Sequence, residues 1–488
     1  MTTRTICLIG VCVLATLLGC RETVDHPREA VAPSAADLGA LRWLAAGGGD
    51  LPENNQVSIE QDLALAGKTF GPSGLLLYAG GPKTAAVQIL ERRPSGDALR
   101  LELAELFDPR PGRDARYRRT ELLPSAAATL DTILAELRRA AETDQTTDFL
   151  IYLAGHGNLG ETAMETGFLT WGGEMLTPRA LEEVLDTAAL LRRFRVVMTS
   201  CFSGGFAEIL FTHADGTLGA APGDRCGLFA ATWDQESSGC DPNPDRGAQD
   251  GYGVHFLHAL RGEDRAGRKL PLAELDLDGD GQISLLEAHT RVRLASGSID
   301  IPTTTSERWL RARAVSDGPR ASVSLPEEEV VVERLSKRLG NLDSARLALE
   351  AVTEELKDAR DALEEAQGAE GAAYRIAAAE LLSRWPVLND PWHPLFERTL
   401  EKNRRLIRAA LEKSSSLQAH SRAAAAVTAA QLDVDELMLR RAALMRLVRA
   451  ADNLQLAGYL KEKGGSDWQV FERLRACENS LPPVDAMK

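Results

Sequence analysis

Apolar residues dominate five short runs in the first half of the chain, and polar residues or glycine follow each run. Runs of this length fit strands that are buried on both faces of a sheet. Between them, apolar residues recur every three or four positions, which is typical of amphipathic helices. The predicted strands are Leu41–Ala46, Leu75–Ala79, Phe149–Ala154, Arg195–Thr199 and Leu228–Ala231, and the predicted helices are Asn55–Gly67, Ser125–Thr143 and Pro178–Leu191.

Strands that alternate with helices predict an α/β fold with a mainly parallel sheet. The pattern changes beyond about residue 316, where apolar positions from Val332 to Leu363 follow a helical spacing that only Arg346 interrupts. This stretch predicts an amphipathic helix that needs a partner helix, and the proline-rich segment 385–394 must end it. Further helices are expected at about 395–414, 417–450 and 453–476. Residues 316–488 are therefore predicted to form a helical hairpin or small bundle, with faces suited to helix-mediated self-association.

The N-terminus has the pattern of an export signal. Arg4 precedes an apolar stretch, Ile6–Leu18, that is short for a membrane span and ends in Gly19-Cys20. This ending resembles the bacterial lipobox, in which the cysteine receives lipid and becomes the mature N-terminus; an ordinary signal peptide is the alternative. We expect residues 1–20 to be a lipoprotein signal peptide and 21–38 to be a spacer. The protein is then anchored to a lipid bilayer of the cell envelope through Cys20.

Charge and cysteine content refine this prediction. The net charge is −15 and the chain has no basic arm, which argues against a nucleic-acid partner. Disulfides persist in exported proteins, and four cysteines lie beyond Cys20. Cys226 and Cys240 are the nearest candidate pair, with two free thiols as the alternative.

Two predicted strands end in residues that together suit nucleophilic chemistry. One ends in Gly155-His156-Gly157, and the other ends in Cys201 followed by a turn of small residues. On neighbouring parallel strands both side chains would emerge at one edge of the sheet. An imidazole can take the proton of a thiol, and the N–H groups of Gly157 and Cys201 can hold the oxyanion that forms. Singly, each residue is more often structural, but their matched positions favour a Cys201–His156 catalytic dyad.

Several blocks in order resemble the legumain-like (C13) cysteine peptidases of the caspase–hemoglobinase fold, over roughly residues 40–262. The resemblance implies a caspase-like α/β/α sandwich, which we place at residues 39–265, and a substrate pocket. The blocks are Gly47–Gly49 with Asn54–Gln56, Leu153–Gly157, Cys201–Gly204, Ala231–Cys240 and Asp250–Tyr252. The pocket residues implied are Thr199, Glu236, Ser237, Ser238, Asp250, Asn54 and Asn55.

The pocket departs from the family at two positions. In the family, a substrate asparagine is recognised by an acidic residue two positions before the cysteine and by a basic residue in the first loop. Here Thr199 stands at the first position, and the first loop has only Asn54, Asn55 and Gln56. Asp250 without a basic partner favours Lys or Arg as the P1 residue.

An acidic segment after this domain predicts a calcium site. Residues 276–287 match the twelve-residue EF-hand loop, with Gly281 at the sharp turn. The loop is single whereas EF-hands generally pair, so we expect structural Ca²⁺ within residues 266–315, held between flanking helices, and no cofactor for catalysis. The predicted ligands are Asp276, Asp278, Asp280, Gln282, Ser284 and Glu287.

These features together predict a secreted, lipid-anchored cysteine endopeptidase that acts on polypeptides through a thioester. A transpeptidase of the same fold would pass the acyl group to an amine. An inactive caspase-fold binding module is another alternative, because the substrate pocket is altered. A further alternative makes the helical part an envelope scaffold that the peptidase regulates.

Overall fold

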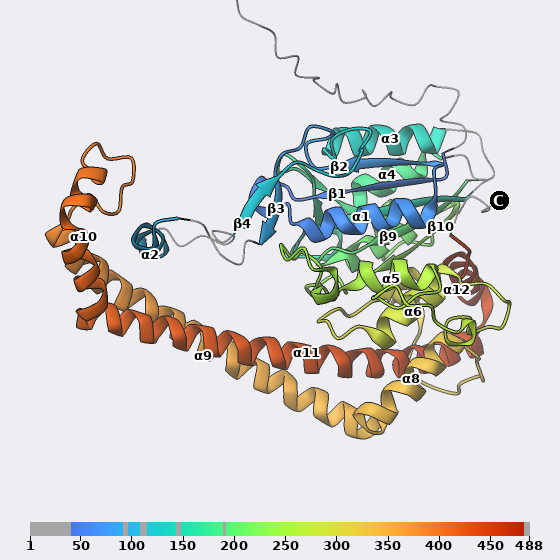
Figure 1. Cartoon of the computed structure of the whole chain (residues 1–488). Helices are drawn as coiled ribbons and strands as arrows, with labels where there is room; N and C mark the ends of the chain where they lie inside the picture. The colour runs from blue at the N-terminus through green and yellow to red at the C-terminus, as the bar shows by residue number, and fades with distance from the viewer. Residues whose placement is uncertain (1–40, 91–95, 108–114, 143–147, 189–191, 483–488) are drawn as a thin grey trace, which may run out of the picture.

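A six-stranded, mainly parallel sheet lies at the centre of the computed structural model, which describes residues 41–90, 96–107, 115–142, 148–188 and 192–482 (Figure 1). The strand order is β11-β10-β9-β5-β1-β2, and only β11 runs antiparallel to its neighbour. The predicted α/β class is confirmed, and a strand is present at each of the five predicted places, although the last, expected at Leu228–Ala231, begins four residues earlier and ends at Phe229. The strands are β1 (Trp43–Gly48), β2 (Gly74–Tyr78), β5 (Asp148–Gly155), β9 (Arg193–Met198), β10 (Asp224–Phe229) and β11 (Thr303–Thr304).

Helices cover both faces of the sheet, which explains why its strands are almost continuously apolar. On one face pack α3 (Leu130–Glu142) and α4 (Pro178–Asp186), and on the other pack α1 (Val57–Phe70), α5 (Tyr252–Leu260) and α6 (Leu285–Ala295). Alternate residues of each strand serve the two cores, as Ala45 and Leu44 of β1 do. This three-layer body positions the carboxyl ends of β5 and β9 at one edge. A further helix, α7 (Thr305–Arg313), follows β11.

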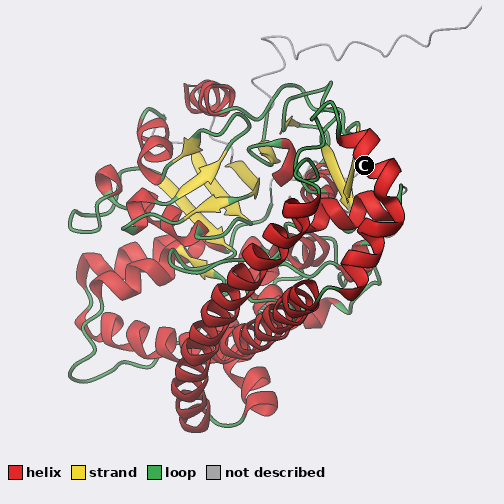
Figure 2. Ribbon diagram, turned by 90° about the vertical axis from the view of Figure 1, so that its left-hand side faces the viewer, coloured by secondary structure: helices red, strands yellow, loops and turns green. Residues whose placement is uncertain are grey.

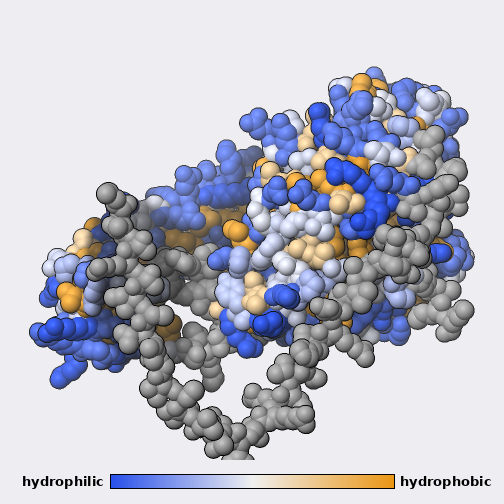
Figure 3. All heavy atoms as spheres, turned by 90° about the horizontal axis from the view of Figure 1, so that it is seen from above, coloured by the Kyte–Doolittle hydropathy of each residue, from blue (hydrophilic) through white to orange (hydrophobic). Residues whose placement is uncertain are grey.

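A long helical arm extends from this body (Figures 1 and 2). Its two longest helices lie side by side and bury a shared apolar seam with α8 that includes Val331, Val352 and Leu447. In the view of Figure 3 the visible surface of the arm is largely hydrophilic, as expected for a paired helical hairpin in water. The helices of the C-terminal part are α8 (Pro326–Leu339), α9 (Leu342–Arg384), α10 (Phe396–Lys413), α11 (Ser415–Lys463) and α12 (Gly465–Glu478).

Two predicted helix boundaries in the arm are wrong. The helix expected over 332–363 is interrupted at Gly340, whose φ of 93° ends α8, and α9 begins after Asn341. Conversely, α11 continues through the break expected near residue 452. Asp452 and Asn453 look like a helix end in the sequence. In the folded chain Asp452 pairs with Arg346 and Asn453 donates to Glu328, so both polar side chains have partners and the helix continues past them.

The sequence analysis missed an insertion between β2 and α3. It contains the hairpin β3 (Val87–Leu90) and β4 (Ala115–Arg118), with α2 (Ala98–Phe107) between them. Leu99, Leu103 and Leu106 of α2 pack against the far end of the arm, where α9 and α10 meet. Ion pairs Arg100–Glu397 and Arg404–Asp97 flank this contact. The arm therefore contacts the α/β part of the chain at both of its ends.

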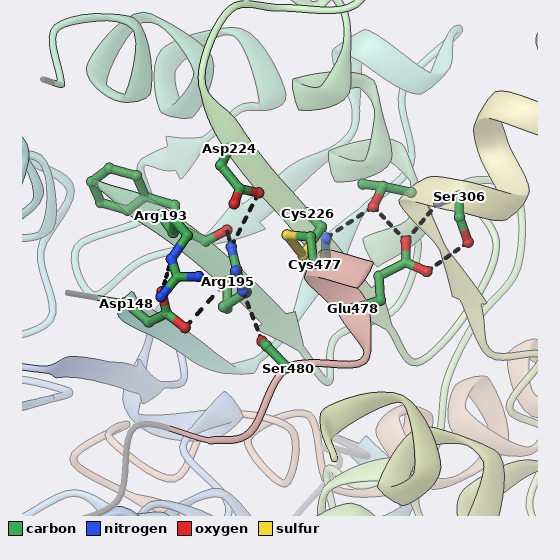
Figure 4. The surroundings of a disulfide bond; sticks show 12 residues. Asp148, Arg193, Arg195, Asp224, Cys226, Ser306, Cys477, Glu478 and Ser480 are labelled. Atoms are coloured by element: carbon green, nitrogen blue, oxygen red, sulfur yellow. Dashed lines mark hydrogen bonds and ion pairs between the residues drawn. A yellow bond between two sulfur atoms is a disulfide. The ribbon is translucent and has the colours of Figure 1, made fainter. Parts of the chain in front are cut away.

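A disulfide joins the C-terminal helix to the sheet (Figure 4). Cys226 of β10 bonds Cys477 of α12, so the candidate pair Cys226–Cys240 is wrong. Beside it, Glu478 is completely buried and accepts from Thr305, Ser306 and the Ser306 backbone. These contacts fix α12 against the edge of the sheet at β10 and β11.

The predicted signal peptide, the spacer and Cys20 lie outside the described residues. Among the helices that are described, none combines the length and the apolar composition that crossing a bilayer requires.

Candidate functional site

The carboxyl ends of β5 and β9 bring His156 and Cys201 to one edge of the sheet. The strands are parallel neighbours, with Leu153 paired to Met198. Thr199 N–H donates to Leu153 O at 3.0 Å, so the register extends past the strand ends. Beyond these paired residues the two strand ends remain close, because Gly157, next to His156, lies against the backbone of Cys201. No hydrogen bond links the two side chains within the described part of the chain.

His156 is held by the loop that follows β1. Its Nε2 lies 2.9 Å from both Asn54 O and the Gln56 side-chain oxygen. Because a backbone carbonyl can only accept, Nε2 carries the hydrogen, and in the neutral ring Nδ1 is then an acceptor. Burial lowers the pKa of His156, although the Asn54 hydrogen bond and the charge of Asp50 act in the opposite direction. The imidazole is therefore a neutral base at physiological pH.

Cys201 lies in a tight turn after β9. Its Sγ accepts the Ser237 N–H at 3.3 Å and lies 3.5 Å from Ser237 O. Burial raises the pKa of the thiol, and the hydrogen bonds from Ser237 oppose this shift. The next residue, Phe202, has φ 57°, a left-handed conformation that a bulky residue rarely adopts. Strain of this kind concentrates at functional sites.

Gly157 packs directly on the backbone of Cys201. A Cβ placed on Gly157 would lie 2.0 Å from Cys201 O, so no other residue fits without a backbone shift. Gly157 begins the short strand β6 (Gly157–Asn158), which pairs antiparallel with β7 (Gly167–Leu169). Leu169 N–H donates to His156 O, so Gly157 and Phe168 face each other as a non-hydrogen-bonded pair. The Gly157 N–H consequently points away from β7. This geometry fits a donor to an oxyanion at the Cys201 edge.

The segment expected to line the substrate pocket is close to Cys201. Ser237 contacts the sulfur as described above, and its hydroxyl donates to Thr199 O at 3.1 Å. Ser238 N–H donates to Asp300 at 2.6 Å. Glu236 is exposed beside them. The structure thus brings Thr199, Ser237 and Ser238 together around the thiol.

Asp250 is engaged inside the protein. One carboxylate oxygen accepts from His255 and Ser296, and the other accepts from the Gly297 N–H. Hydrogen bonds, above all from His255, hold the pKa of Asp250 below its usual value against the effect of burial. Arg265 also lies 3.7 Å from the second oxygen, so a guanidinium already supplies positive charge beside Asp250, which is poorly disposed to receive a substrate cation.

The two asparagines of the first loop have different surroundings. Asn54 donates through its side chain to Asp50 at 2.8 Å, and its carbonyl oxygen contacts His156. Asn55 is completely buried, accepts from Gly49 N–H and donates to Ala86 O. Asn55 therefore shapes the loop from within, while Asn54 reaches the dyad through its backbone.

Sequence reasoning missed three contributors to this edge. Gln56 was noted only as a loop residue, yet it contacts His156. Asp300 is fully buried, with one oxygen on Ser238 and the other without a hydrogen-bond partner, and burial raises its pKa to about 6. Cys240, free in the structure, lies with its Sγ 3.9 Å from Gly155 O. Gln56 and Cys240 both lie within the family-like blocks, whereas Asp300 had no signal in the sequence.

The acidic loop converges on a second, separate site. Carboxylate oxygens of Asp276, Asp278 and Glu287 lie within 4.8 Å of one another. Both Asp276 oxygens accept from loop amides, those of Gly279 and Gly281, which closes the turn. Each Asp276 oxygen keeps a second lone pair, whereas Glu287 Oε1 accepts from the N–H groups of both Leu277 and Asp278. A set of hard oxygen donors around a tight turn fits Ca²⁺.

The remaining predicted ligands lie along the same loop. Asp280 accepts from the Gln282 N–H, and Ser284 caps α6 in a reciprocal box with Glu287. A full helix follows the loop, but only the short turn Leu272–Glu274 precedes it, so one of the expected flanking helices is missing. Asn479, next to α12, bonds both Asp278 and Ser284, so the loop also fastens the C-terminal segment.

A second acidic group, Glu182 and Asp186 with His213, has a different character. Arg225 lies 2.6 Å from Asp186 and 3.6 Å from Glu182, so a guanidinium already supplies the positive charge there. We assign no metal to this group.

Comparison with known proteins adds little to this geometry. No protein-family model matches the chain, and none of the curated proteins is similar to it. Among solved structures, protein GSU0716 from Geobacter sulfurreducens is similar over 54% of this chain and 92% of its own, with 12% identity and a TM-score of 0.30. A likeness that weak carries no functional inference.

Proposed function

We propose that the chain is a cysteine endopeptidase with the caspase–hemoglobinase fold, similar to the legumain-like peptidases. The observation that supports the proposal is the parallel pairing of β5 and β9, whose ends lead into His156 and Cys201, together with the packing of Gly157 on the Cys201 backbone. A thiol, a neutral imidazole with a free Nδ1 acceptor and a backbone donor at one edge suit acyl transfer.

The proposed reaction begins with attack of the Cys201 sulfur on a peptide carbonyl. As the S–C bond forms, the thiol proton passes to His156 Nδ1 and the carbonyl electrons move to oxygen, which the Gly157 and Cys201 N–H groups stabilise. Collapse breaks the C–N bond, and the amine leaves with the proton from His156. Water then attacks the thioester carbonyl while His156 takes its proton, and the S–C bond breaks as that proton passes to the Cys201 sulfur, which releases the carboxylic acid. If an amine took the place of water, the product would be a new peptide bond.

Covalent labelling tests the dyad directly. A peptidyl acyloxymethyl ketone should label the wild-type chain stoichiometrically, label Cys201→Ala not at all, and label His156→Ala about 10²–10⁴-fold more slowly. Cys240→Ser is the matched control, since it removes the neighbouring free thiol and should leave labelling intact. Unlabelled wild type would leave a binding module as the better description. Labelling with cleavage would support the peptidase, and amine-dependent product would support the transpeptidase.

The substrate preference is open to a separate experiment. The internal bonds of Asp250 weaken the expectation that it selects Lys or Arg at P1. Cleavage of peptides that differ only at P1 would test it, because preference for Asn or Asp would reject a cationic P1.

Calcium binding is our second proposed function, supported by the convergence of Asp276, Asp278 and Glu287. When bound, Ca²⁺ would supply charge that holds the loop, α6 and Asn479 together. No step of peptide cleavage requires it. Complete chelation that leaves activity unchanged would rule out a regulatory role.

Attachment to the envelope is proposed from the sequence of the leader alone. Mass spectrometry of the mature protein should find a lipid-modified Cys20 at its N-terminus, and Cys20→Ala should release the protein from the membrane fraction.

Helix-mediated self-association should appear as a mass above that of one chain in light scattering.

A further inference from the structure

The helical arm reaches the loops that carry Cys201 and its neighbours. Arg441 of α11 donates to the Gln235 side chain at 2.8 Å, and the Gln235 carbonyl accepts the Phe202 N–H at 2.9 Å. Phe202 is the residue that directly follows the nucleophile. Two residues after Gln235, Ser237 contacts the sulfur. A single side chain of the arm is therefore connected to both segments that position the thiol.

A second contact from the same helix supports the other side of that segment. Arg446 is buried and donates to three carbonyl oxygens, those of Ser296, Ser298 and Asp300, at 2.6–2.7 Å. Asp300 in turn accepts the Ser238 N–H. Charged donors that satisfy buried carbonyls are strong and directional. The loop beneath the candidate substrate pocket is consequently fixed by the arm as well as by the sheet.

Between the arm and the α/β body lies a cavity of about 470 Å³, whose lining includes residues that follow His156 and Cys201 in the chain. On the body side it is lined by Leu159, which follows the His156-Gly157 turn, and by Phe202, which follows Cys201. On the arm side it is lined by Leu356 of α9 and Met438 of α11. These four side chains are the apolar part of the lining, and the other lining residues, such as Glu236 and Arg360, are polar or charged.

We propose that the arm forms one wall of the substrate site, with this cavity holding a large apolar side chain of the polypeptide next to the scissile bond. Arg441 is the positioning residue that keeps the 235–237 segment against the thiol. The inference rests on the proposed peptidase function and adds to it a subsite and a substrate class. It also gives the helical arm a part in substrate recognition.

Neighbouring residues on α11 provide matched variants for the cavity. Met438→Trp should fill it and lower kcat/KM about tenfold for peptides with Phe or Leu at the adjacent position, while peptides with Gly there keep their rate. Leu439→Trp is the control, because Leu439 is exposed and outside the cavity lining. Identical peptide profiles for the two variants and the wild type would overturn the inference while leaving the peptidase intact.

Arg441 has an equally close control in Arg440, which pairs with Glu355 on the surface. In a Cys240→Ser background, Arg441→Ala should slow iodoacetamide alkylation of Cys201 and lower kcat about five- to tenfold with little change in KM. Arg441→Lys should restore part of both rates, and Arg440→Ala should change neither. Equal behaviour of Arg441→Ala and Arg440→Ala would overturn the positioning role. A wild-type chain that is neither alkylated at Cys201 nor able to cleave peptides would instead overturn the proposed function.

Discussion

The dyad edge and the acidic loop are both recognisable as short motifs, yet the protein builds them in opposite ways. The acidic loop is contiguous, and its carboxylates are oriented by amides of the same twelve residues, such as Gly279 and Gly281. The proposed dyad comes from two strand ends whose alignment depends on the register of the whole sheet. Its supports come from still further away, from Gln56 on one side and Ser237 on the other.

This difference indicates where each site is vulnerable. A local loop loses function mainly through its own ligands, because few distant residues set its geometry. A site assembled across strands loses function wherever the backbone alignment is disturbed, even by a residue without reactive atoms. Perturbation of one backbone contact should therefore do more harm at the dyad than removal of one ligand does at the loop.

The largest effect is expected from Gly157→Ala. The added Cβ would meet Cys201 O at 2.0 Å, so the two turns must separate and the oxyanion donors move. A displaced donor of this kind costs about 10³-fold in kcat/KM, close to 4 kcal/mol. Gly67→Ala in α1 is the control, because a Cβ there meets nothing within 4 Å. Near-normal kinetics in Gly157→Ala would show that the two turns are not in register during catalysis.

The second-largest effect is expected from loss of the disulfide that joins α12 to the sheet. Cys477→Ser should lower the free energy of unfolding by about 3 kcal/mol in urea titrations, because Cys226 and Cys477 close a very long loop. Cys240→Ser, which removes a free thiol, should leave stability within about 0.5 kcal/mol. An equal loss in Cys240→Ser would support the Cys226–Cys240 pair that the sequence first indicated.

The same disulfide shows which parts of the structure could not be predicted from the sequence. Buried parallel strands are nearly continuous apolar runs, so β1, β2, β5, β9 and β10 were found, and the dyad followed from their ends. The Cys226–Cys477 bond, with a separation of 251 residues, leaves no local pattern. The true course of α11 depends on Arg346 and Glu328, which approach it only in the folded chain. Arg441 and Arg446 look like ordinary surface charges of an amphipathic helix until the arm is docked.

The third effect is expected at the acidic loop, when calcium binds to it. Calcium at about 100 times its dissociation constant should stabilise the chain by about 2.7 kcal/mol, measured as a rise in melting temperature. Asp276→Asn should remove that rise, since Asp276 is central to the turn and to the carboxylate cluster. Asp186→Asn, in the acidic group that Arg225 already neutralises, should retain it. A rise that persists in Asp276→Asn would place the calcium elsewhere.

The smallest effect is the pH dependence of the dyad. Burial disfavours the imidazolium form and lowers the pKa of His156, so the neutral base persists to more acidic pH than in a free histidine. The acid limb of kcat/KM should therefore have its midpoint below about pH 6.5 and fall tenfold per pH unit beyond it. Because burial also raises the pKa of Cys201, the resting pair is a thiol and a neutral imidazole. Rates measured with an uncharged peptide separate this titration from that of the substrate. A midpoint above 6.5 would contradict the lowered pKa of His156 on which this expectation depends.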